Sequence, residues 1–327
     1  MKKLIMNLQL FSADVNPINV TTQSSMSPTM KTFYDTTLLE NARETMIFTQ
    51  FGKKQPMKGN KVEWRKFNTF AKALTPLTEG VIPTGQTFGM TKIEGETTQH
   101  GDFTAVSDRL ELESYDDVIF GATEEMGAAE GETYDTLTRN ILVAGNSVAY
   151  CPDAEGNVPE SRSAITKAHI LTPDMVNRAQ TWLKKNKAPK INGSYVALIH
   201  PSVAYDLRSS KAWEEYHKYN DVAPIFKGEI GELHGVRFIE SNECKIWKEG
   251  GTAVYATLFL GKDAFGILDP EGEGMEMIIK TKEQIGGPLN QFGTIGYKFC
   301  HGAKILYQER MLRVESGSSM GDIDEAN

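Results

Sequence analysis

Residues 228–241 read GEIGELHGVRFIES and carry the pattern from which the rest of this 327-residue chain can be interpreted. Three glycines, Gly228, Gly231 and Gly235, are spaced three and four residues apart. Glycine adopts backbone angles that other residues avoid, so the cluster predicts turns. The alternation of Val236 and Phe238 with the residues beside them is typical of an extended segment with one well-buried face. The stretch therefore predicts a turn cluster that leads into a short strand.

The composition indicates a globular protein long enough for two or three compact units. Hydrophobic residues make up 40% of the chain and charged residues 24%. The net charge of −8 argues against nucleic-acid binding as the main role, because phosphate contacts need clustered Lys and Arg. No run of 18 apolar residues occurs, so we predict no membrane partner.

The cysteines predict neither a disulfide framework nor a zinc site. Cys151, Cys244 and Cys300 are odd in number and form no Cys-x-x-Cys pair. This usage favours a reducing cytoplasm.

The N-terminus begins MKKLIMNLQLFS, whose apolar part is interrupted by Asn7 and Gln9 and is too short for a secretory signal. The stretch resembles an Asn-Leu-Gln-aromatic-Phe-Ala-like extension found in Firmicute-type phage structural proteins and in one ribosomal protein. The resemblance implies removal of residues 1–12 by a host cysteine protease acting near Phe11-Ser12. Leu10 and Ser12 depart from the commoner residues, and a frayed terminus without function is the alternative.

Residues 61–106 predict a long two-stranded excursion. Val62, Trp64 and Phe67 lie in a strand-like stretch, a polar span rich in Gly and Pro follows, and an apolar–polar return ends at Val106. So long an excursion is uncommon in a compact domain and usually has a function. An isolated hairpin is marginal in water, so we expect it to need a neighbouring subunit.

The start of this region is basic. Its cations are Lys53, Lys54, Lys58, Lys61, Arg65 and Lys66, with Glu63 as the only acid. We interpret the run as a solvated face or as a contact with the acidic surface of a neighbouring subunit.

A long helix is predicted after residue 113. Ser114 and Asp117 form a start resembling a capping box. An apolar stripe with helical spacing then runs from Val118 to Val148, and Gly145 is a plausible end.

Shorter elements follow. Thr172-Pro173-Asp174 predicts a capped helix start, residues 195–201 a buried strand stopped by proline, and residues 202–208 a short helix. Alternating patterns predict further strands around Met277, Tyr297 and Leu312-Arg313-Val314-Glu315.

The chain lacks motifs for chemistry. Residues 80–87 resemble a phosphate loop but have Gln86 where Lys is required. The six histidines show no metal-ligand spacing, and Asp153, Glu155 and Asn157 do not complete a calcium loop. We therefore predict no catalytic, cofactor-binding or metal-binding residue, no cofactor and no enzymatic activity.

The order of these motifs resembles the major capsid proteins of tailed bacteriophages, in the subfamily named for coliphage N-four. The motifs are the Leu-Thr-Pro-Asp helix, the Ile-His-Pro strand end, the Tyr-Asp-Leu-Arg helix, Trp213, the glycine cluster above and the stretches at 256–266 and 293–314.

The resemblance implies an α+β tailed-phage capsid (Hong Kong 97-type) fold. Its parts would be an N-terminal arm at 1–58, an extended β-hairpin loop at 59–105, a peripheral domain with the spine helix at 106–190, an axial domain at 191–267, return strands of the peripheral domain at 268–316 and a flexible tail at 317–327.

The implied function is self-assembly into an icosahedral head around double-stranded DNA. The expected partners are copies of the chain in pentamers and hexamers, scaffold and portal proteins, and packaged DNA by non-specific proximity. The protein would lie in the virion, and in the host cytoplasm during assembly. The alternative is an encapsulin, a shell of the same fold that packages enzyme cargo.

Overall fold

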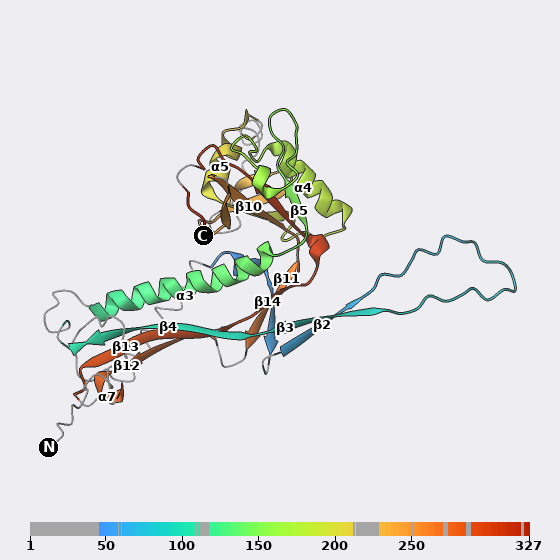
Figure 1. Cartoon of the computed structure of the whole chain (residues 1–327). Coiled ribbons are helices and arrows are strands. Elements are labelled where there is room, and N and C mark those ends of the chain that lie inside the picture. Colours follow the sequence, from blue (N-terminus) through green and yellow to red (C-terminus); the bar gives the residue numbers. More distant parts are fainter. Residues whose placement is uncertain are drawn as a thin grey trace, which may run out of the picture. The chain divides into compact units, whose positions relative to one another are not determined.

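The computed structural model describes residues 46–57, 59, 61–108, 110, 118–211, 213, 229–249, 251–270, 274–285, 289–321 and 324–327 (Figure 1). The chain divides into two compact units. The first comprises Met1–Thr45, Gln99–Thr133 and Glu273–Cys300, and the second comprises Met46–Thr98, Tyr134–Gly272 and His301–Asn327. Most of the predicted arm and the cleavage region at Phe11-Ser12 lie outside the described residues. These units do not test the predicted domain boundaries, which stay a prediction.

The second unit is built on a seven-stranded sheet with the order β5-β15-β10-β6-β8-β7, and β9 also pairs with β10. The strands are β5 (Val148–Tyr150), β6 (Tyr195–Ile199), β7 (Glu229–Leu233), β8 (Val236–Glu240), β9 (Ile246–Glu249), β10 (Thr252–Leu260) and β15 (Met311–Ser316). Strand β10 is antiparallel to both β15 and β6, whereas β6 is parallel to β8. The sheet therefore mixes both kinds of pairing.

Both faces of this sheet are buried. In β6, Ala197 and Ile199 belong to one hydrophobic cluster and Val196 and Leu198 to another. Successive side chains of a strand point to opposite faces, so the continuous apolar run in β10 supplies both clusters at once.

Two helices contribute to one of these clusters, and their starts follow the sequence prediction. Helix α4 (Pro173–Lys185) begins after Thr172, whose hydroxyl accepts a hydrogen bond from the Met175 backbone N–H at 3.4 Å. Helix α5 (Pro201–Arg208) begins one residue earlier than expected, at Pro201, because His200 Nδ1 caps it by accepting from Ser202 N–H at 3.2 Å. Proline at the first helical position costs no hydrogen bond.

The glycine-rich stretch forms a β-hairpin. Strands β7 and β8 are joined by His234 and Gly235, which have positive φ angles of 52° and 73°. Two positive φ angles match the twist of a tight hairpin. The strand prediction for Val236 onward is confirmed, but the turn predicted at Gly231 is wrong. Gly231 lies inside β7, at a register shift against β8, where glycine accommodates a bulge.

Two smaller sheets complete the second unit. Strand β1 (Lys53–Met57) pairs in parallel with β11 (Phe265–Pro270), which pairs with β14 (Ala303–Ile305). Strands β2 (Lys61–Phe67) and β3 (Met90–Glu96) form a separate hairpin. Short 3-10 turns lie at Phe48–Phe51, Arg162–Ala164 and Gln308–Arg310.

The first unit contains a three-stranded sheet with the order β12-β13-β4. These strands are β4 (Thr98–Ser107), β12 (Glu276–Lys280) and β13 (Phe292–His301), and a short helix, α7 (Lys282–Ile285), follows β12. Val106, Met277 and Ile295 form its buried cluster, against which residues from the start of the long helix pack. The alternation predicted around Met277 and Tyr297 is confirmed.

The long helix is α3 (Val118–Val143), and it contributes residues to both units. Its described part confirms a helix over most of the predicted range, and it ends two residues before Gly145. The capping residues Ser114 and Asp117 lie outside the described residues. Within the described part of the chain, no helix combines the length and apolarity needed to cross a membrane.

The chain end differs from the flexible tail that we predicted for residues 317–327. Ser318 is buried and its hydroxyl donates to the Ser202 carbonyl at 3.0 Å. Asp324 accepts from the Tyr255 hydroxyl at 2.6 Å, and Asn327 donates to the Cys244 carbonyl at 3.1 Å. Polar side chains thus hold the described tail residues 317–321 and 324–327 to the second unit.

Strand β15 also departs from its predicted half-exposed pattern, because Arg313 and Glu315 are both buried. Arg162 Nε and Nη2 each donate to the Glu315 carboxylate at 2.8 Å, and the Arg162 guanidinium lies 3.6 Å from the Trp247 ring centroid. Arg313 Nε lies 2.8 Å from the same carboxylate. Burial is possible because one carboxylate serves two guanidinium groups.

Replacing Glu315 with Gln should destabilise the fold by about 3 kcal/mol, since removing one member of a buried ion pair leaves the others without a counter-charge. Urea unfolding measures this: the midpoint concentration should fall, while the dependence of the unfolding free energy on urea concentration should stay the same. Glu309→Gln is the matched control, because Glu309 pairs with Lys66 at the exposed surface and should change stability by less than about 0.5 kcal/mol. Equal midpoints for both variants would contradict the assignment.

Glu130, in α3, is a second buried carboxylate, 0% exposed, and neither of its oxygens has a hydrogen-bond partner among the described residues. Burial raises its pKa to about 7. The folded-state pKa exceeds the ordinary value of 4.5, so this group lowers stability as the pH rises from about 4.5 through 7.

Glu130→Gln should therefore be close to neutral at pH 4.5 and stabilise the protein by about 2 kcal/mol at pH 8. Unfolding curves of both proteins across this pH range measure the difference. The control is Glu125→Gln on the exposed side of the same helix, which should show no such trend. A Glu130→Gln effect that does not vary with pH would rule out titration of this group.

Candidate assembly surface

The β2–β3 hairpin is regular along its paired length. Seven residue pairs match without a register shift, from Lys61 opposite Glu96 to Phe67 opposite Met90. Its ion pairs, such as Lys92 with Glu63 at 2.8 Å, lie at the exposed surface. Such pairs contribute little to stability, so the hairpin depends on other contacts for its order.

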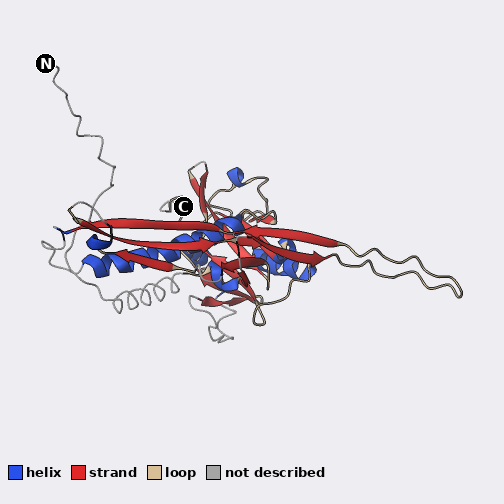
Figure 2. Ribbon diagram, turned by 90° about the horizontal axis from the view of Figure 1, so that it is seen from below, coloured by secondary structure: helices blue, strands red, loops and turns tan. Residues whose placement is uncertain are grey.

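Residues 68–89 connect the two strands as a long open loop. Few hydrogen bonds cross it, among them Asn68 N–H to the Gly89 carbonyl at 2.9 Å and Gln86 Nε2 to the Ala71 carbonyl at 2.8 Å. Figures 1 and 2 show this loop continuing well past the ends of β2 and β3. It therefore has no packed core of its own.

Large apolar side chains follow this loop and remain exposed. Leu74 is 83% and Ile82 is 93% exposed. We call the whole set the loop surface, and its members are Phe67, Phe70, Leu74, Leu77, Val81, Ile82, Phe88 and Met90. Within this set, the Phe88 ring contacts those of Phe67 and Phe70, with centroids 5.0 and 6.0 Å apart. Large exposed apolar side chains gathered on one loop are typical of a site of protein association.

The base of the hairpin, in contrast, is closely packed. The Trp64 ring lies against the backbone of Gly95 and Gly266, where an added Cβ would come within 2.7 and 2.9 Å of the ring. Glycine within a strand often marks such a close approach. The hairpin is thus fixed at its base and open at its tip.

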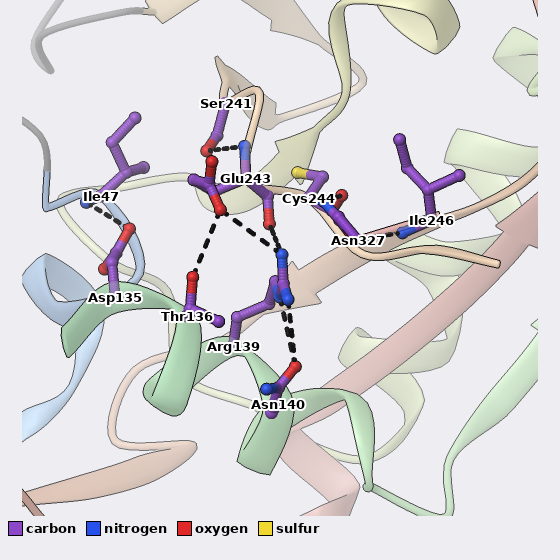
Figure 3. A network of polar contacts seen from close by, with 10 residues as sticks. All are labelled: Ile47, Asp135, Thr136, Arg139, Asn140, Ser241, Glu243, Cys244, Ile246 and Asn327. Atoms are coloured by element: carbon purple, nitrogen blue, oxygen red, sulfur yellow. Dashed lines mark hydrogen bonds and ion pairs between the residues drawn. The ribbon is translucent and has the colours of Figure 1, made fainter. Parts of the chain in front are cut away.

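A polar network fixes the first described residues of the chain to α3 (Figure 3). The Asp135 carboxylate accepts from the backbone N–H groups of Ile47 at 2.9 Å and Thr49 at 3.2 Å. Burial raises the pKa of Asp135 to about 6, although these backbone hydrogen bonds favour its charged form. Asp135 therefore holds the first described residues, which lie within the predicted arm at 1–58, to α3.

Arg139 extends this network to the turn after β8. Its Nη1 donates to the Glu243 carbonyl at 2.8 Å and lies 3.6 Å from the Glu243 carboxylate. Thr136 also donates to that carboxylate at 3.3 Å, as Figure 3 shows. These contacts join α3 to the turn at Ser241–Cys244 within the second unit.

Several of the cysteines and histidines weighed as candidate reactive or metal-binding residues are buried or make hydrogen bonds within the fold. Cys151 and Cys244 are buried free thiols whose pKa values are raised by burial. His200 caps a helix, and His301 makes a 2.9 Å hydrogen bond with Thr138. No group of three His, Cys, Asp or Glu side chains capable of holding a metal occurs in the described part of the chain. The loop at 80–87 lies in the open part of the hairpin, and no helix follows it.

The basic run at 53–66 divides in the structure. Lys61 pairs with Glu96, and Lys58 lies outside the described residues. Lys53, Arg65 and Lys66 instead line one pocket together with Trp64. The role of Trp64 was not predicted from the sequence, although Gly95 and Gly266, each within a strand, were a signal of close packing.

Comparisons with known proteins agree with this architecture. A family model described as phage capsid protein matches residues 90–267, which is more than half of the chain. The fold is similar to the capsid of Ralstonia phage GP4 (TM-score 0.63, 13% identity, covering 99% of this chain and 100% of that one). It is also similar to the capsid asymmetric unit of cyanophage Pam1 (0.66, 11%, 97% and 100%) and to the capsid of cyanophage P-SCSP1u (0.61, 14%, 84% and 89%). No curated protein sequence matches the chain.

These matches show an α+β tailed-phage capsid (Hong Kong 97-type) fold with the long helix and extended hairpin described above. The chain belongs to the phage capsid protein family.

Proposed function

We propose that the chain is a major capsid protein of the type named for coliphage N-four, and that pentamers and hexamers of it form the icosahedral head around double-stranded DNA. The observation that carries this proposal is the exposed loop surface on a chain of the phage capsid family. Apolar side chains in a solvated loop stabilise a structure only when another surface covers them and removes them from water.

The mechanism is association. In a closed shell each subunit repeats the same contacts with its neighbours, so modest individual contacts add up. The loop of one subunit would reach over a neighbour, and the closely packed base at Trp64 would hold the loop in position. The proposed subunit consists of four parts. They are an arm (1–58), a loop (59–105), a peripheral domain (106–190 and 268–316) and an axial domain (191–267).

Other partners follow from this role. Scaffold and portal proteins would guide assembly in the host cytoplasm, and the net charge of −8 favours only non-specific proximity to packaged DNA. The family match favours a virion over an encapsulin compartment. No reaction is assigned to the chain.

Light scattering and negative-stain images of the purified protein test the proposal. Closed shells, pentamers or hexamers are expected. Nucleic acid inside particles from infected cells would support a virion, whereas a protein cargo would point to an encapsulin. A small dimer or tetramer with a bound metabolite would overturn the capsid function.

Cleavage near Phe11-Ser12 predicts a loss of the first 11 or 12 residues from particle-derived protein. Intact-mass spectrometry of particles from the natural host measures this directly. Particles that retain Met1 would show that the segment is not removed.

Removing apolar side chains from the loop surface should separate assembly from folding. The variant Leu74→Ser, Leu77→Ser, Ile82→Ser changes three highly exposed residues, so the circular dichroism spectrum and melting temperature should be unchanged. Each buried leucine or isoleucine contributes about 1.5 to 3 kcal/mol, so the protein concentration needed for assembly should rise at least about tenfold.

The matched control is Val158→Ser, an exposed apolar residue outside the hairpin. It should assemble like the parent protein. If the triple variant forms normal shells at the parental concentration, the loop surface is not an assembly contact.

A further inference from the structure

A polar pocket of about 240 Å³ lies at the base of the β2–β3 hairpin, within the second unit. Four cationic residues line it: Lys53, Arg65, Lys66 and Arg310. They come from β1, β2 and the 3-10 turn before β15, so the fold gathers charges from distant parts of the sequence. This concentration of positive charge contrasts with the net charge of −8 of the whole chain.

Nearby acids offset this charge only in part. Asp263 is the one acidic residue in the lining. Arg65 pairs with Glu63 at 2.8 Å and Lys66 with Glu309 at 3.2 Å, and both pairs are exposed to solvent. Exposed pairs are weak and exchange readily with other anions. Lys53 has no ion-pair partner among the described residues.

An aromatic ring holds two of the cations in place. Arg310 Cζ lies 3.8 Å and Lys66 Nζ 4.5 Å from the centroid of the Tyr307 ring. Arg310 also donates from Nη1 to the Lys262 carbonyl at 3.2 Å. A guanidinium has five N–H donors, so Arg310 is positioned and still has donors for a ligand.

Trp64 supplies the second, independent indication of a ligand. Trp64 is one of the residues that line the pocket, and its buried Nε1 has no acceptor among the described residues. An indole N–H can only donate, and a buried donor without an acceptor costs free energy. The tight packing of the ring against Gly95 and Gly266 prevents it from turning toward solvent.

We propose that this pocket binds a compact oxyanion, a phosphate or carboxylate group, through the Trp64 indole N–H, Arg310, Lys66 and Lys53. The oxyanion supplies the acceptor that Trp64 lacks and the negative charge that the four cations favour. It comes either from free phosphate or from an acidic side chain on a second copy of the chain. Binding of the anion by the unassembled chain does not depend on the capsid function, whereas the second source rests on it.

Isothermal titration of the full-length, unassembled chain with sodium phosphate, and separately with sodium acetate, tests the site at constant ionic strength. We expect saturable binding of one anion per chain. Arg310→Gln and Trp64→Phe should each weaken it at least tenfold, the latter because it removes the N–H and keeps an aromatic ring. Lys53→Gln gives a third variant in which the aromatic contacts are intact. Lys190→Gln, an exposed lysine elsewhere in the same unit, should bind like the parent protein.

Repeating the titration on assembled particles distinguishes the two sources. Particles that still bind one phosphate per chain would identify a free-anion site. Loss of phosphate binding on assembly would indicate that a carboxylate of a second copy fills the pocket. If the parent protein binds neither anion, or if all the pocket variants bind like Lys190→Gln, the site does not exist.

Discussion

Burial of β10 on both faces is the constraint on which the second unit depends. Tyr255 and Phe259 belong to the cluster that contains α4 and α5, whereas Ala256, Leu258 and Leu260 belong to the cluster that contains Phe48 and Leu142. A strand covered on both sides cannot shift by one residue without exchanging its two apolar sets. It thereby fixes the register of its neighbours β6 and β15, and with them the helices and the tail that pack on the sheet.

The hairpin shows the opposite distribution of apolar residues. In the sheet, apolar side chains are covered by the same chain, but those of the loop surface are not. Between these extremes lies Trp64, where two glycines allow a large ring to pack against the backbone. A closely packed base and an exposed apolar tip suit a hairpin whose loop completes its packing only on another molecule. This division explains why the same chain supports both a stable fold and association into a shell.

Local patterns in the sequence predicted the elements well, because caps and alternation are short-range effects. The cap at Thr172 before Pro173, the buried strand from Tyr195, which ends at Ile199, and the alternation around Met277 are confirmed. Features that depend on partners distant in sequence were not predictable. Arg313 and Glu315 look like an exposed face until Arg162 is placed beside them, and the tail looks flexible until Tyr255 and Cys244 supply its partners.

The same reason limits what sequence could show of the functional surfaces. The apolar residues of the loop were visible, but only the structure shows that they remain uncovered. The basic run suggested a uniform charged face, whereas the fold pairs Lys61 with Glu96 on the hairpin and brings Lys53 and Lys66 together with Arg310 in a pocket. The net charge of a sequence counts every charged residue equally. Because salt screens distant charges, a bound anion interacts mainly with those within about 10 Å. A chain with a net negative charge can therefore hold a locally positive site, provided that its fold brings cations together around a donor such as Trp64.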